Sequence, residues 1–311
     1  ARREAQRVGY PVMLKATSGG GGRGIRRCDN EAELARNFER VVSEATKAFG
    51  SADVFLEKCI VDPRHIEVQI LADQHGNTIH LFERDCSIQR RNQKLIEIAP
   101  SPQLTPEQRT YVGDLAVRAA EAVGYTNAGT VEFLFTGNQV YFMEMNTRVQ
   151  VEHTITEQIT GVDIVREQIR IAAGDPLAYR QSDIRHQGFA LQFRINAEDP
   201  FNDFRPSPGK IASFHSSKGH GVRVDTSVYA GYTIPPYYDS MIAKLICRAP
   251  TREECIKKME RALDEFIIEG VKTTVPFHQQ LMKDERFRNG DFHTGFLNDF
   301  ELKPEEPKKK K

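Results

Sequence analysis

The sequence has no excess of charge of either sign and no long apolar run. Its 311 residues include 43 Lys and Arg against 43 Asp and Glu, so the composition predicts no broad basic surface for nucleic acid. No apolar run approaches the roughly 18 residues of a membrane-spanning helix, and no signal-like segment is present. We therefore expect a soluble, cytoplasmic protein with neither a membrane nor a nucleic acid as partner.

The sequence also lacks paired cysteines. Its cysteines are odd in number, scattered and without a Cys-x-x-Cys pair, which argues against a zinc site or a disulfide framework. We expect each to be a buried, reduced thiol: Cys28, Cys59, Cys86, Cys247 and Cys255.

The two ends of the sequence carry little information about function. The chain begins without Met, inside a predicted helix over residues 1–8 that no N-cap residue precedes. This pattern suggests a fragment that lacks an N-terminal part. Residues 303–311 are rich in Lys, Glu and Pro, and we expect a disordered tail or linker there.

Strands and helices alternate without a repeat, which indicates an α+β fold with mixed or antiparallel sheets. Helices are predicted from Glu31 after an Asp29 or Asn30 cap, from Pro106 after Thr105, and after the capping box that begins at Thr251. A further helix is expected over residues 162–173. Alternating strands are expected over residues 65–71 and 189–198.

The run Gly19–Gly24 follows a short apolar strand that contains Lys15. No Gly-Lys-Ser/Thr occurs, so the run is not a phosphate-binding P-loop, and the segment after it reads as a return strand. A glycine hairpin can lie over phosphates and donate backbone N–H groups to them, with Lys15 beneath. The alternative is a mobile surface loop beside a salt-bridged lysine.

Two carboxylates lie in apolar strands on either side of the turn Gly137-Asn138. Glu132 and Glu144 are each embedded in apolar residues, and a buried carboxylate requires a cation or a donor. Together with Asn146 they suggest a magnesium site. A regular two-residue turn would place Glu132 opposite Met143, so a shared metal requires either an odd connection or a bulge.

From Glu144 to Glu152, every second residue is polar and has a side chain that can bind a metal ion or an anion. A charged edge strand is the simple alternative to a site for a metal and anions. Fully extended, the stretch would span roughly 26 Å at about 3.3 Å per residue, too long for one metal and one anion. We therefore expect the strand to end near Asn146 and the chain to curl so that Arg148, Gln150 and Glu152 close around an anion.

Five segments in order resemble one family. Residues 11–24, residues 83–94 and the run Glu144-Met-Asn-Thr-Arg-Val-Gln-Val-Glu-His153 closely resemble the biotin carboxylase component of biotin-dependent carboxylases, an ATP-grasp family. Residues 194–200 and 229–240 resemble its C-terminal domain. The resemblance implies an ATP-grasp domain over residues 1–185, with a lid at about 11–62 and a catalytic core at about 63–185. A biotin carboxylase C-terminal domain would occupy residues 186–302.

The resemblance implies carboxylation of carrier-bound biotin, with ATP and bicarbonate first forming carboxyphosphate. Glu152 would be the general base, Arg194 would stabilise the biotin enolate, and Arg148 and Lys94 would complete the catalytic set. Bicarbonate would bind Arg148, Gln150, Val151 and Lys94. Glu132, Glu144 and Asn146 would hold Mg²⁺ or Mn²⁺. ATP would bind ten residues: Lys15, Gly20, Gly21, Gly22, Glu57, Lys58, Ile60, His65, Gln89 and Asn92.

Several alternatives stay open beside the resemblance. Arg194 could form a structural ion pair with Glu198, His65 could be a satisfied strand histidine, and Arg84, Arg90 and Arg91 could be ion-paired structure. The chain could also be a truncated nucleotide-binding scaffold without turnover. Another ATP-grasp ligase, such as a carbamoyl-phosphate-type enzyme, is a third hypothesis, against which the run Arg148-Val-Gln-Val-Glu152 and a second domain with Arg194 argue. No biotinylation segment occurs, so the family's partners would be a biotin carboxyl carrier and a carboxyltransferase component, with a possible homodimer.

Overall fold

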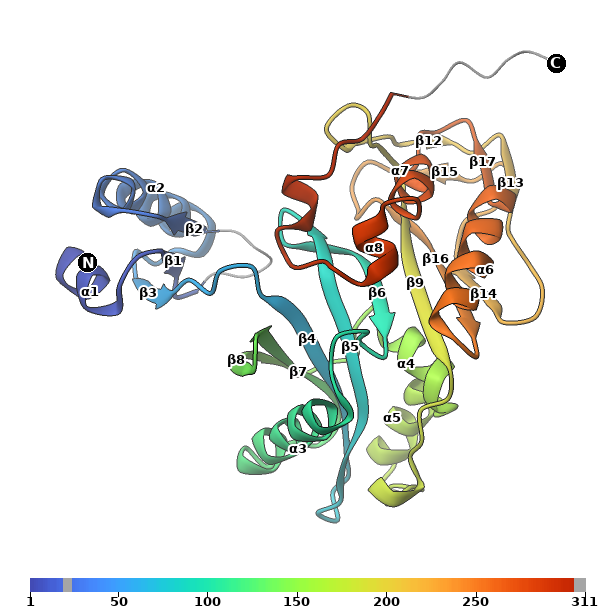
Figure 1. The fold of residues 1–311 in the computed structure, drawn as a ribbon, viewed down its shortest axis with the longest axis horizontal. Coiled ribbons are helices and arrows are strands. Elements are labelled where there is room, and N and C mark those ends of the chain that lie inside the picture. Colours follow the sequence, from blue (N-terminus) through green and yellow to red (C-terminus); the bar gives the residue numbers. More distant parts are fainter. Residues whose placement is uncertain (19–23, 305–311) are drawn as a thin grey trace. The chain divides into compact units, whose positions relative to one another are not determined.

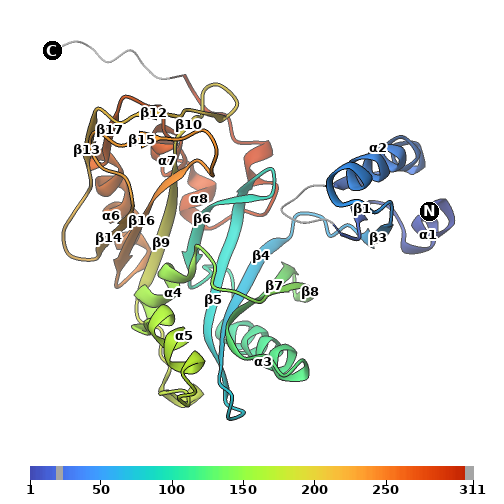
Figure 2. The ribbon, with the colours of Figure 1, turned by 180° about the vertical axis from the view of Figure 1, so that it is seen from behind.

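The computed structural model describes residues 1–18 and 24–304, which form two compact units (Figures 1 and 2). Unit 1 comprises residues 1–63 and 90–93, and unit 2 the remainder. Gly20, Gly21 and Gly22, expected to contact ATP phosphates, lie outside the described residues.

Unit 1 is a three-stranded antiparallel sheet, in the order β2-β1-β3, with two helices. Asn30 caps α2 by accepting a hydrogen bond from the backbone of Glu33, as its sequence predicts, and Gly50 ends the helix in the left-handed conformation. The return strand after the glycine run is present. The elements are α1 (Arg2–Val8), β1 (Val12–Ala16), β2 (Ile25–Cys28), α2 (Glu31–Phe49) and β3 (Val54–Lys58).

Unit 2 is built on an eight-stranded sheet in the order β14-β16-β9-β6-β5-β4-β7-β8. Antiparallel ladders join β4 to β5 and β7, β7 to β8, β9 to β6 and β16, and β16 to β14. One sheet thus runs through both the expected catalytic core and the expected C-terminal domain. Its strands are β4 (Arg64–Ala72), β5 (Thr78–Arg90), β6 (Gln93–Ala99), β7 (Asn127–Thr136), β8 (Gln139–Asn146), β9 (Phe189–Asn196), β14 (Val222–Thr226) and β16 (Met241–Ala249).

Helices cover this sheet, and short strand pairs complete the C-terminal part. The helices are α3 (Pro106–Ala122), α4 (His153–Thr160), α5 (Ile164–Ala172), α6 (Arg252–Glu265), α7 (Val275–Leu281) and α8 (Glu285–Asn289), with 3-10 turns η1 (Gln181–Asp183) and η2 (Phe296–Asn298). The strand pairs are β10 (Glu198–Asp199) with β11 (Arg205–Pro206), β12 (Gly209–Lys210) with β15 (Thr233–Ile234), and β13 (Ser213–His215) with β17 (Ile267–Glu269).

The capping boxes predicted at Thr105 and Thr251 are confirmed at the starts of α3 and α6. The helix predicted over residues 162–173 is shorter, because Asp163 caps α5 and Gly161 ends a preceding helix with φ 74°. That preceding helix, α4, was not predicted from the sequence.

Helix α4 fixes the position of Glu152, the residue immediately before it. Figure 2 shows α4 beside β9. Its Ile155 and Ile159 are buried and form an apolar cluster with Ala99 and Ala190 of the sheet. This packing ties a catalytic candidate to the rigid centre of unit 2.

All five cysteines are free and buried, as expected from their spacing. Among the helices that the structure describes, none is long and apolar enough to cross a membrane.

Candidate active site

A β-bulge brings Glu132 and Glu144 opposite each other in the β7–β8 hairpin. Thr136 pairs with Gln139 across the two-residue turn, and Phe133 pairs with Phe142. The register then shifts by one, so that Glu132 pairs with Glu144 instead of Met143. The bulge that a shared metal requires is therefore present.

Asn146 links the two carboxylates. Its Nδ2 lies 3.0 Å from Glu132 Oε1 and 3.4 Å from Glu144 Oε1. Carboxylate and amide oxygens are the ligands that Mg²⁺ prefers. Asn146 would offer its Oδ1 once its amide turned over, because its Nδ2 now faces both carboxylates and its Oδ1 accepts from Arg148. The residues present thus fit a magnesium ion, and β8 ends at Asn146, as predicted.

One expectation about this hairpin is wrong. Glu132 is buried, but Glu144 is exposed, as are Tyr141, Phe142 and Met143. These apolar residues were expected to form a core strand, whereas β8 is the last strand of its sheet. An edge strand has a neighbour on one side only, which leaves its side chains accessible.

The Lys94 ammonium lies among three carboxylates. It is 2.9 Å from Glu132 Oε1 and 2.7 Å from Glu152 Oε1, and it also contacts Glu67. Burial acts to lower the pKa of Lys94, but Glu67 and the other neighbouring acids outweigh it and raise that pKa well above its usual value. Burial likewise acts to raise the pKa of Glu67, but Lys94 and Arg84 lower it to about 2.

One metal-ligand atom from each of His65, Glu67 and Glu132 lies within 4.8 Å of the other two, close enough to share a metal ion. The Lys94 ammonium contacts two of these groups directly. We therefore assign the positive charge at this cluster to Lys94.

The carboxylate of Glu152 is held between two cations. One oxygen contacts Lys94, and the other lies 2.9 Å from Arg194 Nη2. Arg194 Nε in turn donates to Glu97 at 2.6 Å. Burial acts to lower the pKa of Arg194, but Glu97 and Glu152 raise it, so this guanidinium stays charged.

Two expectations about these cations need correction. Arg148 was expected to close around an anion together with Glu152, but it donates to Asn146 Oδ1 and to the carbonyl of Val149, each at 3.3 Å, and Glu152 instead contacts Lys94 and Arg194. The alternative ion pair of Arg194 with Glu198 is also wrong, because Glu198 accepts from Ser240 and Asn196.

Gln150 belongs to a network around the fully buried Arg84. Gln150 Nε2 donates to Glu132 Oε1 at 2.8 Å, and Gln150 Oε1 accepts from Arg84 Nη2 at 3.1 Å. The guanidinium of Arg84 also donates to four further side chains: Glu67, Gln69, Thr130 and Thr156. Arg84 is thus ion-paired structure, as one alternative held, and it also orients Gln150.

Both ring nitrogens of His65 lie close to a polar side chain. Its Nε2 lies 2.8 Å from Glu132 Oε2, and its Nδ1 lies 2.8 Å from Gln89 Nε2. Two of the expected nucleotide-binding residues therefore contact each other next to the carboxylate hairpin. The alternative of a satisfied strand histidine fits only the Nδ1 contact, because the buried Nε2 makes no hydrogen bond of good geometry.

The other described nucleotide-binding candidates lie in unit 1. Lys15 forms an ion pair with Glu57, and Lys58 Nζ donates to the carbonyls of Gly9 at 2.8 Å and Tyr10 at 3.1 Å. Ile60 is half-buried, and Asn92 lies in the β5–β6 turn with φ 64°. Lys15 is thus salt-bridged, as the alternative of a surface loop beside a salt-bridged lysine expects.

Three charged residues of the site were missed in the sequence: Glu67, Glu97 and Lys244. Glu67 lies between His65 and Gln69 in an alternating strand, the same signal that singled out residues 144–152. Glu97 is a carboxylate within the apolar strand β6, like Glu132 within β7. Both could have been found by applying these two criteria to every strand.

Comparison with known families divides the chain in two. Residues 1–180 match the family model of the carbamoyl-phosphate synthase L chain ATP-binding domain. Residues 192–299 match the model of the biotin carboxylase C-terminal domain. The second match separates this chain from ATP-grasp enzymes that lack such a domain.

Similar proteins are biotin carboxylases and components of larger carboxylases. The chain is 58% identical over 301 residues to the 2-oxoglutarate carboxylase small subunit of Hydrogenobacter thermophilus, covering 96% of this chain and 64% of that protein. It is 55% identical over 300 residues to biotin carboxylase 1 of Bacillus subtilis, covering 96% and 67%. The chain thus spans about two thirds of the length of these relatives.

A solved structure agrees closely with this fold. The biotin carboxylase domain dimer of Hydrogenobacter thermophilus 2-oxoglutarate carboxylase, in complex with MgADP, ADP and bicarbonate, has a TM-score of 0.93 and 57% identity. The match covers 96% of this chain and 66% of that one. The chain therefore belongs to the biotin carboxylase family, with an ATP-grasp fold followed by a biotin carboxylase C-terminal domain.

Proposed function

We propose that this protein catalyses the ATP- and bicarbonate-dependent carboxylation of carrier-bound biotin through carboxyphosphate. The observation that carries the proposal is the placement of Glu152, whose carboxylate lies between Lys94 and Arg194. A base flanked by one cation suited to phosphate and another suited to an enolate fits both halves of this reaction. The family assignment supports the same activity.

In the first half-reaction, Glu152 accepts the proton of bicarbonate. A bicarbonate oxygen then bonds to the γ-phosphorus of ATP, the bond from that phosphorus to the β-phosphate oxygen breaks, and ADP leaves. Arg148, Gln150 and the backbone N–H of Val151 bind the anion, since a guanidinium matches a planar carboxylate-like group. Lys94 balances the negative charge that gathers between the phosphate and bicarbonate.

In the second half-reaction, the carboxyl group passes from carboxyphosphate to N1′ of biotin, and phosphate is released. Arg194 stabilises the negative charge on the ureido oxygen as N1′ loses its proton to the released phosphate. The raised pKa of Arg194 suits this role, because the guanidinium does not lose its charge. Glu97 holds the guanidinium in place through its Nε.

Glu132, Glu144 and Asn146 would hold Mg²⁺ or Mn²⁺, which supplies positive charge to the phosphate oxygens when bound. We assign ATP binding to the ten residues expected from the sequence.

The proposal also covers the domains, the partners and the compartment of the protein. We propose an ATP-grasp domain over residues 1–185 and a C-terminal domain over residues 186–302. A biotin carrier and a carboxyltransferase would be partners, as the carboxylase names of the relatives suggest. The domain dimer of the Hydrogenobacter structure supports a homodimer. Buried free cysteines fit a reducing compartment such as the cytoplasm.

The test is ADP formation by the full-length protein with MgATP, bicarbonate and free biotin. Turnover should require bicarbonate, rise with biotin, and be lost in Glu152→Gln and Arg194→Ala. Glu253→Gln, at an exposed residue of α6, is the control and should behave as wild type. Nucleotide binding without turnover would instead support the scaffold alternative, and turnover independent of both bicarbonate and biotin would contradict the proposal.

A further inference from the structure

Two consecutive carbonyls of the loop after β8 are held by side chains. The Gln150 carbonyl accepts from His153, whose ring Nδ1 lies 2.7 Å away and whose backbone N lies 3.3 Å away. The Val151 carbonyl accepts from Lys244 Nζ of β16 at 3.2 Å and, at the longer distance of 3.4 Å, from Thr154 Oγ1 of α4. The loop that carries the proposed bicarbonate ligands is thus attached at two successive peptides.

Holding a carbonyl also orients the amide of the next residue. A trans peptide is planar, and its C=O and N–H point in opposite directions. His153 therefore sets the direction of the Val151 N–H, which is the backbone donor proposed for bicarbonate. Lys244 sets the peptide between Val151 and Glu152, and hence the point from which the Glu152 side chain leaves the backbone.

Lys244 is itself held in place. Its Nζ lies 3.4 Å from Asp225 Oδ2, and Arg223 binds the same carboxylate through two contacts of 2.7 and 2.9 Å. The side chain of Lys244 is only 13% exposed. A buried ammonium between a carboxylate and a backbone carbonyl has few other positions available.

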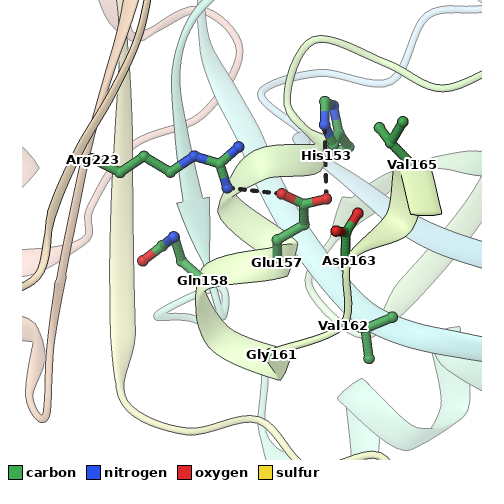
Figure 3. Close-up of a pocket in the computed structure, with 8 residues that line it drawn as sticks. All are labelled: His153, Glu157, Gln158, Gly161, Val162, Asp163, Val165 and Arg223. Atoms are coloured by element: carbon green, nitrogen blue, oxygen red, sulfur yellow. Dashed lines mark hydrogen bonds and ion pairs between the residues drawn. The ribbon is translucent and has the colours of Figure 1, made fainter. Parts of the chain in front are cut away.

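The contacts close into a ring that returns to the loop. Arg223 Nη1 lies 2.8 Å from Glu157 Oε2, and His153 Nε2 lies 3.9 Å from Glu157 Oε1. Figure 3 shows Glu157 of α4 between these two partners. Starting from the Val151 carbonyl, the ring passes through β16, β14 and α4 and ends at the Gln150 carbonyl.

We propose that Lys244 is a positioning residue for bicarbonate, acting through the Val151 carbonyl on the Val151–Glu152 peptide. This inference rests on the proposed function for its substrate. It assigns Lys244 no contact with bicarbonate or ATP.

The first measurement compares hydrogen exchange in residues 149–153 of the full-length wild-type protein with that of Lys244→Met and Lys244→Arg. Met keeps the length of the side chain but removes the Lys244 donor and leaves the Val151 carbonyl only the longer Thr154 contact. Exchange in this segment should therefore rise by about 10-fold, and Arg should restore most of the protection. Lys258→Met is a matched control. Lys258 Nζ also donates to two backbone carbonyls, those of His220 at 3.0 Å and Arg248 at 2.8 Å, but it has no contact with the loop.

The second measurement is steady-state kinetics with bicarbonate and MgATP varied separately. Lys244→Met should raise the KM for bicarbonate by about 10-fold or more while changing the KM for ATP by less than about twofold. Lys258→Met should change neither. A merely structural role would instead lower activity without separating the two substrates.

The outcomes distinguish this inference from the proposed function. Wild-type protein without bicarbonate-dependent turnover contradicts the proposed function, and the exchange data then decide alone whether Lys244 holds the loop. Equal exchange in Lys244→Met and Lys258→Met overturns the inference. So does an active Lys244→Met enzyme with an unchanged KM for bicarbonate.

Discussion

Glu132 lies directly across the strand pair from Glu144, and the side-chain amide of Asn146 reaches both carboxylates. A one-residue shift in register would move one carboxylate to the other face of the sheet. The bulge at Met143 therefore decides whether this hairpin can hold a metal ion.

The exposed carboxylate of Glu144 allows a test of the metal site without loss of stability. Glu144→Gln should raise the Mg²⁺ concentration for half-maximal turnover by about 10-fold, because one charged ligand is lost. The measurement is a Mg²⁺ titration of activity at fixed ATP. Glu121→Gln, at an exposed residue of α3, is the control. Superimposable titrations of Glu144→Gln and wild type would show that Glu144 is not a ligand.

Arg84 should be among the most sensitive positions for stability. Arg84→Met leaves Glu67 and four other polar side chains without their donor in a fully buried site, at a cost of about 3–5 kcal/mol in the free energy of unfolding. Urea denaturation measures this change. Arg118→Met removes an exposed arginine of α3 and should cost no more than about 0.5 kcal/mol. Equal values for the two variants would contradict a structural role for Arg84.

The ion pair between Lys15 and Glu57 should contribute little to stability. Their side chains are 24% and 46% exposed, and pairs at such sites contribute less than about 1 kcal/mol. Glu57→Gln should therefore leave urea unfolding nearly unchanged while altering the affinity for ATP, measured by calorimetry. Strong destabilisation with unchanged ATP affinity would instead favour Lys15 as a structural lysine.

The buried His278 should make the protein less stable in mild acid. Burial lowers its pKa from 6.5 to about 4, against the effect of its hydrogen bond to the Arg194 carbonyl. The unfolded chain binds a proton as the pH falls below 6.5, while the folded protein does not until about pH 4. The contribution of neutral His278 to the free energy of unfolding is therefore fully present above pH 6.5 and is lost as the pH falls toward 4.

His278→Gln keeps an N–H donor but does not titrate, so its unfolding free energy should fall less between pH 7 and pH 4. The difference in pH dependence should reach about 3 kcal/mol. His215→Gln, at an exposed histidine, should follow the wild-type profile. Parallel profiles for His278→Gln and wild type would show that His278 titrates normally in the folded protein.

Local features of the fold could be predicted from the sequence. The caps of α2, α3 and α6 depend on side chains within three residues of the helix start. The sequence therefore identifies Thr105 and Thr251 and narrows the cap of α2 to Asp29 or Asn30, of which the structure shows Asn30. Helix α4 was missed because it lacks such a cap: Glu152 precedes it without a side-chain hydrogen bond to its backbone.

The partners within the site could be predicted only in part. Alternation along β8 and apolar neighbours of Glu132 pointed to the carboxylate hairpin, and the turn geometry left either an odd connection or a bulge, of which the structure shows the bulge. The exposure of Glu144 followed from the strand order, which places β8 at the edge. A strand's own residues do not show which neighbours it has.

By itself, the sequence determined the α+β class, the helix caps, the family and the candidates for chemistry, because these depend on neighbouring residues or on motifs read in order. Only the tertiary structure decided which cationic side chain forms an ion pair with which carboxylate. Lys94 and Arg194 are 58 and 42 residues from Glu152, whereas the nearby Arg148 turns to Asn146 and Val149. Pairing over such distances depends on how strands from different parts of the chain meet in one sheet, and spacing along the chain does not record that.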